Sequence, residues 1–218
     1  MQSAAEHVYE LLKQRLIGGA YAPGAALKEA PLAKELEVSR TPIRAALKKL
    51  AEDGLVIADR NRGVRAAEWT DADIDETYAL RELLEGHAAA LAAQRGGVEL
   101  AEKLDALNLE MSFAISAGGD VLPEQLQDIN ARFHRAILAA SGAPRLRTIL
   151  SSLIDMPIIL RSHYISSAED KLQSLSHHRD LSTAVRAGDP ELAQRIMQLH
   201  LRIAAHRFKR QRSRFRKE

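Results

Sequence analysis

Residues 38–50 read VSRTPIRAALKKL and carry an apolar stripe and a basic stripe within one helix-length run. On a 3.6-residue period the apolar side chains share one face: Ile43, Leu47 and Leu50. The polar and basic side chains share another: Arg40, Thr41, Arg44 and Lys48. Ser39 precedes them, where its hydroxyl can accept a hydrogen bond from a free backbone N–H of the first turn, and Pro42 is tolerated in that turn. The pattern predicts a helix that begins near Ser39, packs one face and presents the other.

An ordinary surface helix with solvated cations has the same pattern, so the flanking sequence has to decide between the two interpretations. Upstream, residues 7–17 have helical spacing and end at GGAYAPG, and residues 31–36 predict a short second helix before a turn at Glu37 and Val38. Downstream, residues 55–58 and 64–67 flank DRNRG and predict a hairpin with a basic tip. This order of elements is that of a winged helix-turn-helix, in which the presented helix enters the major groove of DNA.

Charge and composition agree with this interpretation. The chain of 218 residues has a net charge of only +2, yet between Ser39 and Arg65 seven Lys and Arg stand against three Asp and Glu. A polyanion is expected to contact that region. A hydrophobic content of 46% with only 4% aromatic residues favours a mostly α protein with a real core.

Several classes of protein are disfavoured by what the sequence lacks. It has no cysteine, which excludes disulfides and thiolate metal sites. Neither a signal-peptide pattern at the start nor about 18 uninterrupted apolar residues occur. We therefore expect a cytoplasmic protein with no membrane partner.

The remaining 150 residues predict an antiparallel six-helix bundle, because glycine-containing breaks separate helical patterns by short connections. The predicted helices are 71–95, 98–117, 122–141, 143–165, 168–187 and 189–211. The expected domains are a winged helix-turn-helix at 1–68, a linker at 69–71, an all-α effector-binding and dimerisation domain at 72–211 and a basic tail at 212–218. We expect the end of the last helix to be frayed and solvated, since it has no strong apolar stripe.

Four polar residues of this bundle have the spacing of a metal site. Asn130 and His134 are four residues apart and share a helical face. His178 and His200 each lie 11 residues from Asp189, or roughly 16 Å along their helices, so they stand level in an antiparallel pair. Three imidazoles and one side-chain oxygen suit a divalent ion such as Zn²⁺ or Ni²⁺. A histidine in an Ala/Leu-rich helix is otherwise most often a surface or satisfied core residue.

Nearly the whole of residues 7–67 resembles the DNA-binding domain of the GntR family of bacterial transcription regulators, on the segments PGAALKE, LAKELEVSRTPIRAALKKLAEDGLV and NRGVRA. The resemblance implies main DNA contacts from Arg40, Thr41 and Arg44, with Arg62 and Gly63 at the wing. The remaining cations are expected to contribute electrostatically: Lys48, Lys49, Arg60 and Arg65. Ala45 and Glu37 depart from the family pattern, which usually has Glu and often has Gly at these positions.

The bundle resembles the FCD domain of the FadR subfamily, on RELLEGHAAALAA, ARFHRAILAASGAPRL and HHRDLSTAVRAGDPELAQRIMQLHL, and its six helices resemble the VanR-like branch. In that domain one Asp and three His bind a metal. His134, His178 and His200 match the histidines, but Asn130 stands at the Asp position, and a neutral carboxamide is a weaker ligand than a carboxylate. Arg81 matches a basic residue that often points to the effector. Its spacing from Glu85 is equally that of a surface ion pair.

The expected function is therefore a homodimeric repressor rather than an enzyme. It would bind an inverted-repeat operator in double-stranded DNA and respond to a small carboxylate at a divalent metal. One alternative is a constitutive DNA-binding regulator whose metal site has degenerated at Asn130. Another is a metal-dependent hydrolase, although no carboxylate adjoins the histidines in a hydrolytic spacing such as HExxH.

Overall fold

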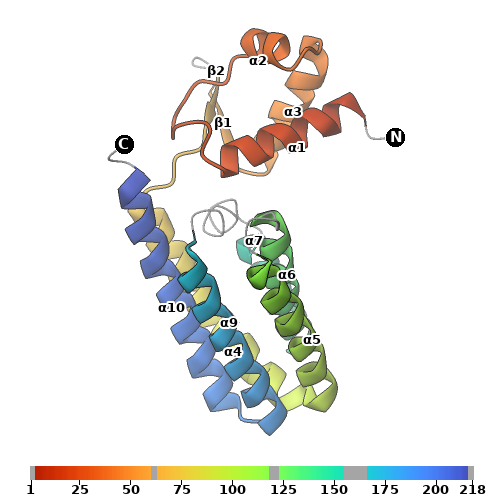
Figure 1. Cartoon of the computed structure of the whole chain (residues 1–218), viewed down its shortest axis with the longest axis vertical. Coiled ribbons are helices and arrows are strands. Elements are labelled where there is room, and N and C mark those ends of the chain that lie inside the picture. Colours follow the sequence, from red (N-terminus) through yellow and green to blue (C-terminus); the bar gives the residue numbers. More distant parts are fainter. Residues whose placement is uncertain (1–2, 60–62, 118–122, 155–165, 216–218) are drawn as a thin grey trace. The chain divides into compact units, whose positions relative to one another are not determined.

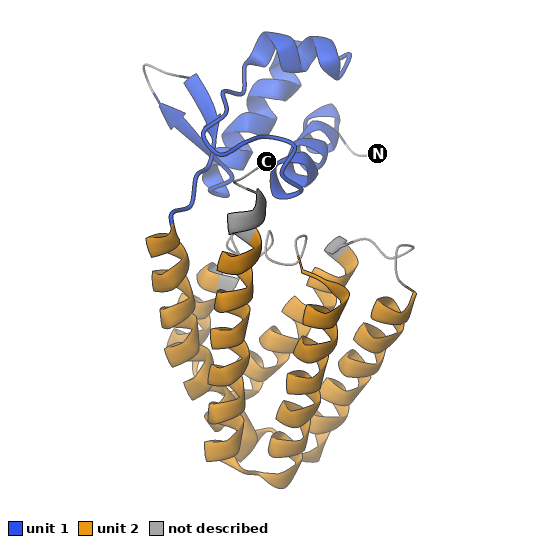
Figure 2. Ribbon diagram, turned by 60° about the vertical axis from the view of Figure 1, so that its left-hand side comes forward, with its two compact units in different colours: residues 1–70, 156–161 blue, residues 71–155, 162–218 orange. Residues whose placement is uncertain are grey.

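The computed structural model describes residues 3–59, 63–117, 123–154 and 166–215, which form nine helices and two strands (Figure 1). The chain divides into two compact units, the first running to Thr70 and the second beginning at Asp71 (Figure 2). Within the described ranges, no helix is both long and apolar enough to cross a membrane.

The first unit is a winged helix-turn-helix. It consists of α1 (Ala4–Ile17), α2 (Glu29–Glu35), α3 (Arg40–Glu52) and the antiparallel strands β1 (Val56–Asp59) and β2 (Gly63–Ala66). The strands pair from Val56 with Ala66 to Asp59 with Gly63. Helices α1 and α3 pack on each other over a core of fully buried side chains: Val8, Leu12, Ile43 and Leu50. The apolar stripe of the quoted stretch thus faces the interior, as predicted.

Helix α1 begins three residues earlier than the apolar spacing predicts. Ser3 and Glu6 form a capping box, in which the Ser3 hydroxyl accepts from the Glu6 N–H at 3.2 Å and the Glu6 carboxylate accepts from the Ser3 N–H at 2.8 Å. These bonds satisfy two backbone donors that a helix start otherwise leaves free. The cap therefore extends the helix beyond its buried stripe.

The turn between α2 and α3 contains a backbone conformation that the sequence does not reveal. Glu37 has φ +55°, and the N–H of Val38 donates to the carbonyl of Ala33 at 3.0 Å. This bond and the left-handed residue before it are the marks of a Schellman ending, which favours glycine at the position of Glu37. Glu37 is the one residue other than glycine with positive φ among those that the structure describes.

Ser39 is the N-cap residue of α3, but its hydroxyl makes no capping hydrogen bond, so that part of the prediction is wrong. The usual donors to an N-cap oxygen are the second and third N–H groups of the helix. The third residue here is Pro42, which has no N–H. Proline therefore sets the backbone angle of the first turn while removing one partner of the serine.

In its described residues, the second unit forms a bundle of six helices, as predicted. They are α4 (Asp71–Arg95), α5 (Gly97–Ser116), α6 (Pro123–Ala140), α7 (Pro144–Ile154), α9 (Ala168–Ala187) and α10 (Pro190–Phe215). Residues 155–165, which the sequence assigns to the fourth helix, lie outside the described residues. The core contains Phe133, Leu181, Met197 and Leu201, each no more than 1% exposed.

The turn between α9 and α10 sets the height of the two histidines on these helices. Gly188 has φ +64°, and its N–H donates to the carbonyls of Ala184 and Val185. A left-handed glycine closes the helix end and reverses the chain within three residues, so α9 and α10 pack side by side as an antiparallel pair.

The end of α10 corrects the expectation of a frayed, solvated helix. The helix continues to Phe215, and Phe208 is only 2% exposed. Arg207 donates to the Asp170 carbonyl at 2.8 Å and pairs with its carboxylate at 3.2 Å, while Gln211 donates to the same carboxylate. Asp170 is in the first turn of α9, 37 residues away in sequence, which is why local composition did not reveal the contact.

Candidate functional site

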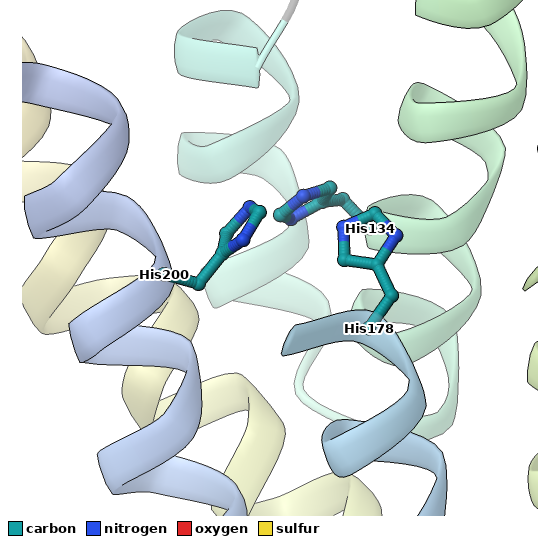
Figure 3. A group of neighbouring side chains, drawn as sticks. All are labelled: His134, His178 and His200. Carbon is teal, nitrogen blue, oxygen red and sulfur yellow. The ribbon is translucent and has the colours of Figure 1, made fainter. Parts of the chain in front are cut away.

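Three histidines from three helices meet inside the bundle. His134 lies on α6, His178 on α9 and His200 on α10, and Figure 3 shows their rings turned toward one another. Each offers one nitrogen, and these atoms lie within 4.8 Å of one another. Ring centroids are separated by 5.5 Å (His134–His178), 5.3 Å (His134–His200) and 4.9 Å (His178–His200). All three side chains are buried.

The packing around the cluster holds the rings in place. The ring of Phe133 stacks on that of His178, with centroids 3.9 Å apart and planes within 2° of parallel. Burial and the neighbouring imidazoles and Arg81 lower the pKa of His200 well below its ordinary value. Its ring is therefore neutral at pH 7, the form in which imidazole is a metal ligand.

Two nitrogens of the cluster support a metal site independently of its shape. Nε2 of His134 and Nδ1 of His200 are buried without a hydrogen-bond partner among the described residues. A buried polar atom without a partner costs free energy, and a bound metal ion removes that cost by accepting the nitrogen lone pair. Bound Zn²⁺ has nitrogen ligands at about 2.0–2.1 Å, which puts them about 3.4 Å apart in a tetrahedron. The ligand nitrogens of the three histidines lie within 4.8 Å of one another and all three side chains are buried, so the residues present fit a divalent ion.

Asn130 lies one turn before His134 on α6 and is 7% exposed. Its position on the helical face of His134 is as predicted. As a fourth ligand its amide oxygen would be neutral. The three histidines and Asn130 together would therefore provide a divalent ion with no negative charge.

A buried ion pair connects this cluster to α4. Nε of Arg81 donates to Oε1 of Glu85 at 2.6 Å, and Oε2 of Glu85 lies 2.5 Å from Nδ1 of His134. Arg81 and Glu85 are each only 3% exposed, so the surface ion pair considered for them is wrong. Burial alone would raise the pKa of Glu85, but the charge of Arg81 and the contact with His134 lower it to about 2. Glu85 is therefore a carboxylate at neutral pH.

Sequence reasoning recognised the spacing of Arg81 and Glu85 but missed the contact between Glu85 and His134. The signal within the sequence was a charged pair in the Ala-rich run RELLEGHAAALAA, where small residues allow α4 to be buried on several sides. Buried charges are retained where they are paired and hydrogen-bonded. The pair can be recognised as part of the site only when α4 and α6 are packed together.

The predicted DNA contacts of α3 share its exposed face. Arg40, Thr41, Arg44 and Lys48 are all exposed, opposite the buried Ile43 and Leu47. Gly63 begins β2 with φ +73°, a conformation that glycine adopts without strain, at the edge of the hairpin turn. Arg60 and Arg62 lie outside the described residues.

Other cations of this unit have structural partners. Nζ of Lys49 lies 4.1 Å from the centroid of the Tyr9 ring, and the Tyr9 hydroxyl donates to Asp53 at 2.6 Å. Arg65 donates to the Gly24 carbonyl at 3.1 Å. These contacts direct Lys49 and Arg65 toward the protein itself.

Arg44 has an acidic partner that the sequence did not reveal. Glu29, the first residue of α2, accepts from Nε of Arg44 at 3.0 Å and from Nη2 at 2.9 Å. Both side chains are on the surface, and that of Arg44 is 72% exposed. The two bonds hold the guanidinium in one orientation on the exposed face of α3.

Each of the two units matches a known protein family. Residues 4–65 match the model of the bacterial regulatory proteins, gntR family, and residues 76–203 match that of the FCD domain. The chain is 29% identical over 192 residues to the uncharacterised HTH-type transcriptional regulator YdhC of Bacillus subtilis (strain 168), covering 88% of this chain and 85% of that protein. It is 29% identical over 201 residues to the probable D-xylose utilization operon transcriptional repressor of Paenarthrobacter nicotinovorans, covering 91% and 86%.

A solved structure agrees with these matches. The McbR/YncC protein of Escherichia coli superposes with a TM-score of 0.66 at 27% identity, covering 94% of this chain and 98% of that one. The chain belongs to the gntR family of bacterial regulatory proteins and, with its FCD domain, is a transcription regulator of the FadR-like subfamily.

Proposed function

We propose that this regulator binds an inverted-repeat operator as a homodimer and represses transcription there until a small carboxylate reaches a divalent metal in the FCD bundle. The observation that carries the proposal is the buried cluster of His134, His178 and His200, in which two ring nitrogens have no partner among the described residues. Repression is supported by relatives named as repressors, including GlaR of Escherichia coli at 25% identity over 198 residues. A DNA-binding regulator acts where the chromosome is, so we place the protein in the cytoplasm.

For DNA binding, we assign base-edge contacts to Arg40, Thr41 and Arg44 and backbone contacts to Lys48. Arg62 and Gly63 complete the surface at the wing. Arginine can pair with both acceptors of a guanine edge in the major groove, whereas lysine neutralises phosphate. Two-fold pairing of the chains would set two such helices about one turn of DNA apart, which calls for an inverted repeat.

The operator is best found by genomic footprinting, followed by fluorescence anisotropy on the recovered sites. Arg40→Ala and Arg44→Ala are each expected to lower operator affinity about tenfold or more and to relax base preference. Arg145→Ala, which removes an exposed arginine from α7, is the matched control and should leave both unchanged. Equal operator binding by the two α3 variants and the wild type would refute the assignment.

For the effector site, we assign the metal to His134, His178 and His200, with Asn130 as a neutral fourth ligand and Zn²⁺ or Ni²⁺ as the ion. The metal would supply a Lewis acid to which an effector carboxylate can bind. Glu85 accepts from Nε of Arg81, and we assign the two Nη groups of Arg81 to the carboxylate of the effector. Binding changes DNA affinity only if the effector prefers one arrangement of the dimer.

Elemental analysis of protein purified without chelator tests the metal, and His200→Ala should lose it. Calorimetry with a panel of organic acids, with and without chelator, tests the effector. Acid binding that survives both chelation and Arg81→Ala would refute this pocket. Metal-free protein that cannot be loaded with Zn²⁺ or Ni²⁺, yet still binds its operator, would instead identify a constitutive regulator with a degenerate site.

A hydrolase is the less favoured alternative. It needs a general base beside a metal-bound water. Glu85, the carboxylate in contact with the cluster, lies on the Nδ1 side of His134 and is paired with Arg81, so it is placed to support a ligand. An enzyme of this kind would also show no sequence-specific DNA binding.

A further inference from the structure

The four assigned ligands pose an electrostatic problem. A divalent ion held by three neutral imidazoles and one carboxamide brings two uncompensated positive charges into a buried site, which is strongly unfavourable without a nearby anion. His134, His178 and His200 are 2%, 1% and 6% exposed, so water offers little compensation. An anion within the protein would solve the problem if it were next to a ligand.

Glu85 is in that position. Its Oε2 is 2.5 Å from Nδ1 of His134, and its other oxygen accepts from Arg81. Two oxygens on two different partners give the carboxylate a defined orientation inside the bundle. Glu85 therefore contacts the metal ligand His134 but is not itself one of the assigned ligands.

The same contact determines which nitrogen of His134 faces the cluster. A carboxylate accepts hydrogen bonds, so the hydrogen of the neutral ring lies on Nδ1, and the lone pair lies on Nε2. Nε2 is the nitrogen that is buried without a partner among the described residues. The ring is thus set in the tautomer that metal binding requires, before any ion arrives.

We propose that Glu85 is a positioning residue of the metal site: it holds His134 in the Nδ1–H tautomer and supplies, one ring away from the ion, the negative charge that Asn130 does not. Arg81 holds Glu85 in place and offsets part of its charge, so the compensation depends on the carboxylate, and not the guanidinium, contacting the ligand. This inference rests on the proposed metal site, and it predicts that the site binds its ion tightly despite the carboxamide at residue 130.

The first test is Zn²⁺ affinity, measured on the full chain by competition with a chromophoric chelator. Glu85→Gln keeps the shape of the side chain and removes its charge, and it should weaken Zn²⁺ binding about 10- to 100-fold at unchanged stoichiometry. Glu82→Gln is the matched control, since Glu82 is on the same helix but pairs with Arg202 at 2.6 Å. The Zn²⁺ affinity of Glu82→Gln should stay within about twofold of that of the wild type, because the carboxylate of Glu82 contacts none of the metal ligands.

Loss of Glu85 leaves Arg81 buried without an anion, and Glu85→Gln could fail to fold for that reason. The double variant Arg81→Met/Glu85→Gln removes both charges, and circular dichroism verifies its fold. Adding Asn130→Asp to either background should raise Zn²⁺ affinity by a larger factor than Asn130→Asp does in the wild type, because the new carboxylate then replaces a charge that Glu85 no longer supplies. A merely structural role for Glu85 predicts the same factor in every background.

A second readout needs no metal. Long-range ¹H–¹⁵N correlations of the histidine rings report the tautomer, and wild-type His134 should carry its hydrogen on Nδ1, with a shift toward the other tautomer in Arg81→Met/Glu85→Leu. If the wild type binds Zn²⁺ and Glu85→Gln binds it with an affinity within twofold of the wild type, this inference is overturned and the proposed metal site stands. Failure of the wild type itself to bind Zn²⁺ or Ni²⁺ would overturn both.

Discussion

Replacing Glu37 by glycine should stabilise the DNA-binding unit. Glu37 has φ +55° at the Schellman ending of α2, where its Cβ is crowded against the backbone. That conformation costs a residue with a Cβ roughly 1–2 kcal/mol. Glycine is free of this strain, but it loses about 0.4–1 kcal/mol more backbone entropy on folding.

The two effects leave a net gain of about 1 kcal/mol for Glu37→Gly. For a unit of this size the gain corresponds to about 4–8 °C in melting temperature, or about 2–4 °C if the whole chain melts in one step. Differential scanning calorimetry of the full chain, with and without operator DNA, measures the shift and assigns it to the unit that binds DNA.

Glu37→Ala is the control that separates backbone strain from charge. It removes the same carboxylate but keeps a Cβ, so it should melt close to the wild type. Glu37→Asn should fall between the two, because asparagine tolerates the left-handed region better than most residues. Both Gly and Ala variants should bind DNA slightly more tightly, since each removes a negative charge beside the phosphates. Equal stabilisation by glycine and alanine would refute the strain argument.

Three further predictions concern other contacts. Asn130→Asp should tighten Zn²⁺ binding on the order of tenfold or more by adding a negative ligand, and unchanged affinity in chelator competition would argue against Asn130 as a ligand. Glu29→Gln should raise the affinity for non-specific DNA, because the surface loses a negative charge. It should also lower the ratio of operator affinity to non-specific affinity in anisotropy titrations, because Arg44 loses its orienting partner. An unchanged ratio would show that this orientation of Arg44 is irrelevant. The pKa of Asp170 is lowered because the Ser167 and arginine contacts outweigh the effect of burial, so its stabilisation is present above its ordinary pKa and is lost as the pH falls through the lowered value. Asp170→Asn should cost roughly 1–3 kcal/mol at neutral pH and flatten the acid side of the stability curve, and parallel curves for the two proteins would exclude this contribution.

Much of the candidate site follows from patterns within single segments. The apolar period of residues 43–50 selects the buried face of α3 and leaves Arg40 and Arg44 exposed. The equal distances of His178 and His200 from Asp189 place them level, because a tight turn makes α9 and α10 antiparallel. Both arguments use only helix geometry and a short connection, which are properties of neighbouring residues.

Other features depended on partners far apart in the sequence. Spacing makes Arg81 and Glu85 neighbours on α4 but is the same for a surface pair and a buried one. Glu85 meets His134 across 49 positions, and Arg207 meets Asp170 across 37. No pattern within a single segment of the sequence predicts which of several helices will pack against a given face of another helix.

The sequence by itself determined the winged helix-turn-helix, the six-helix bundle, the polar face of α3 and the three histidines that can share an ion, because helix period and turn chemistry act between residues a few positions apart. Only the tertiary structure decided that Glu85 contacts His134, that Glu29 pairs with Arg44 and that Asp170 contacts the end of α10. Each of these contacts joins two elements through charged groups, and whether a charge is solvated or buried against a partner is settled by packing.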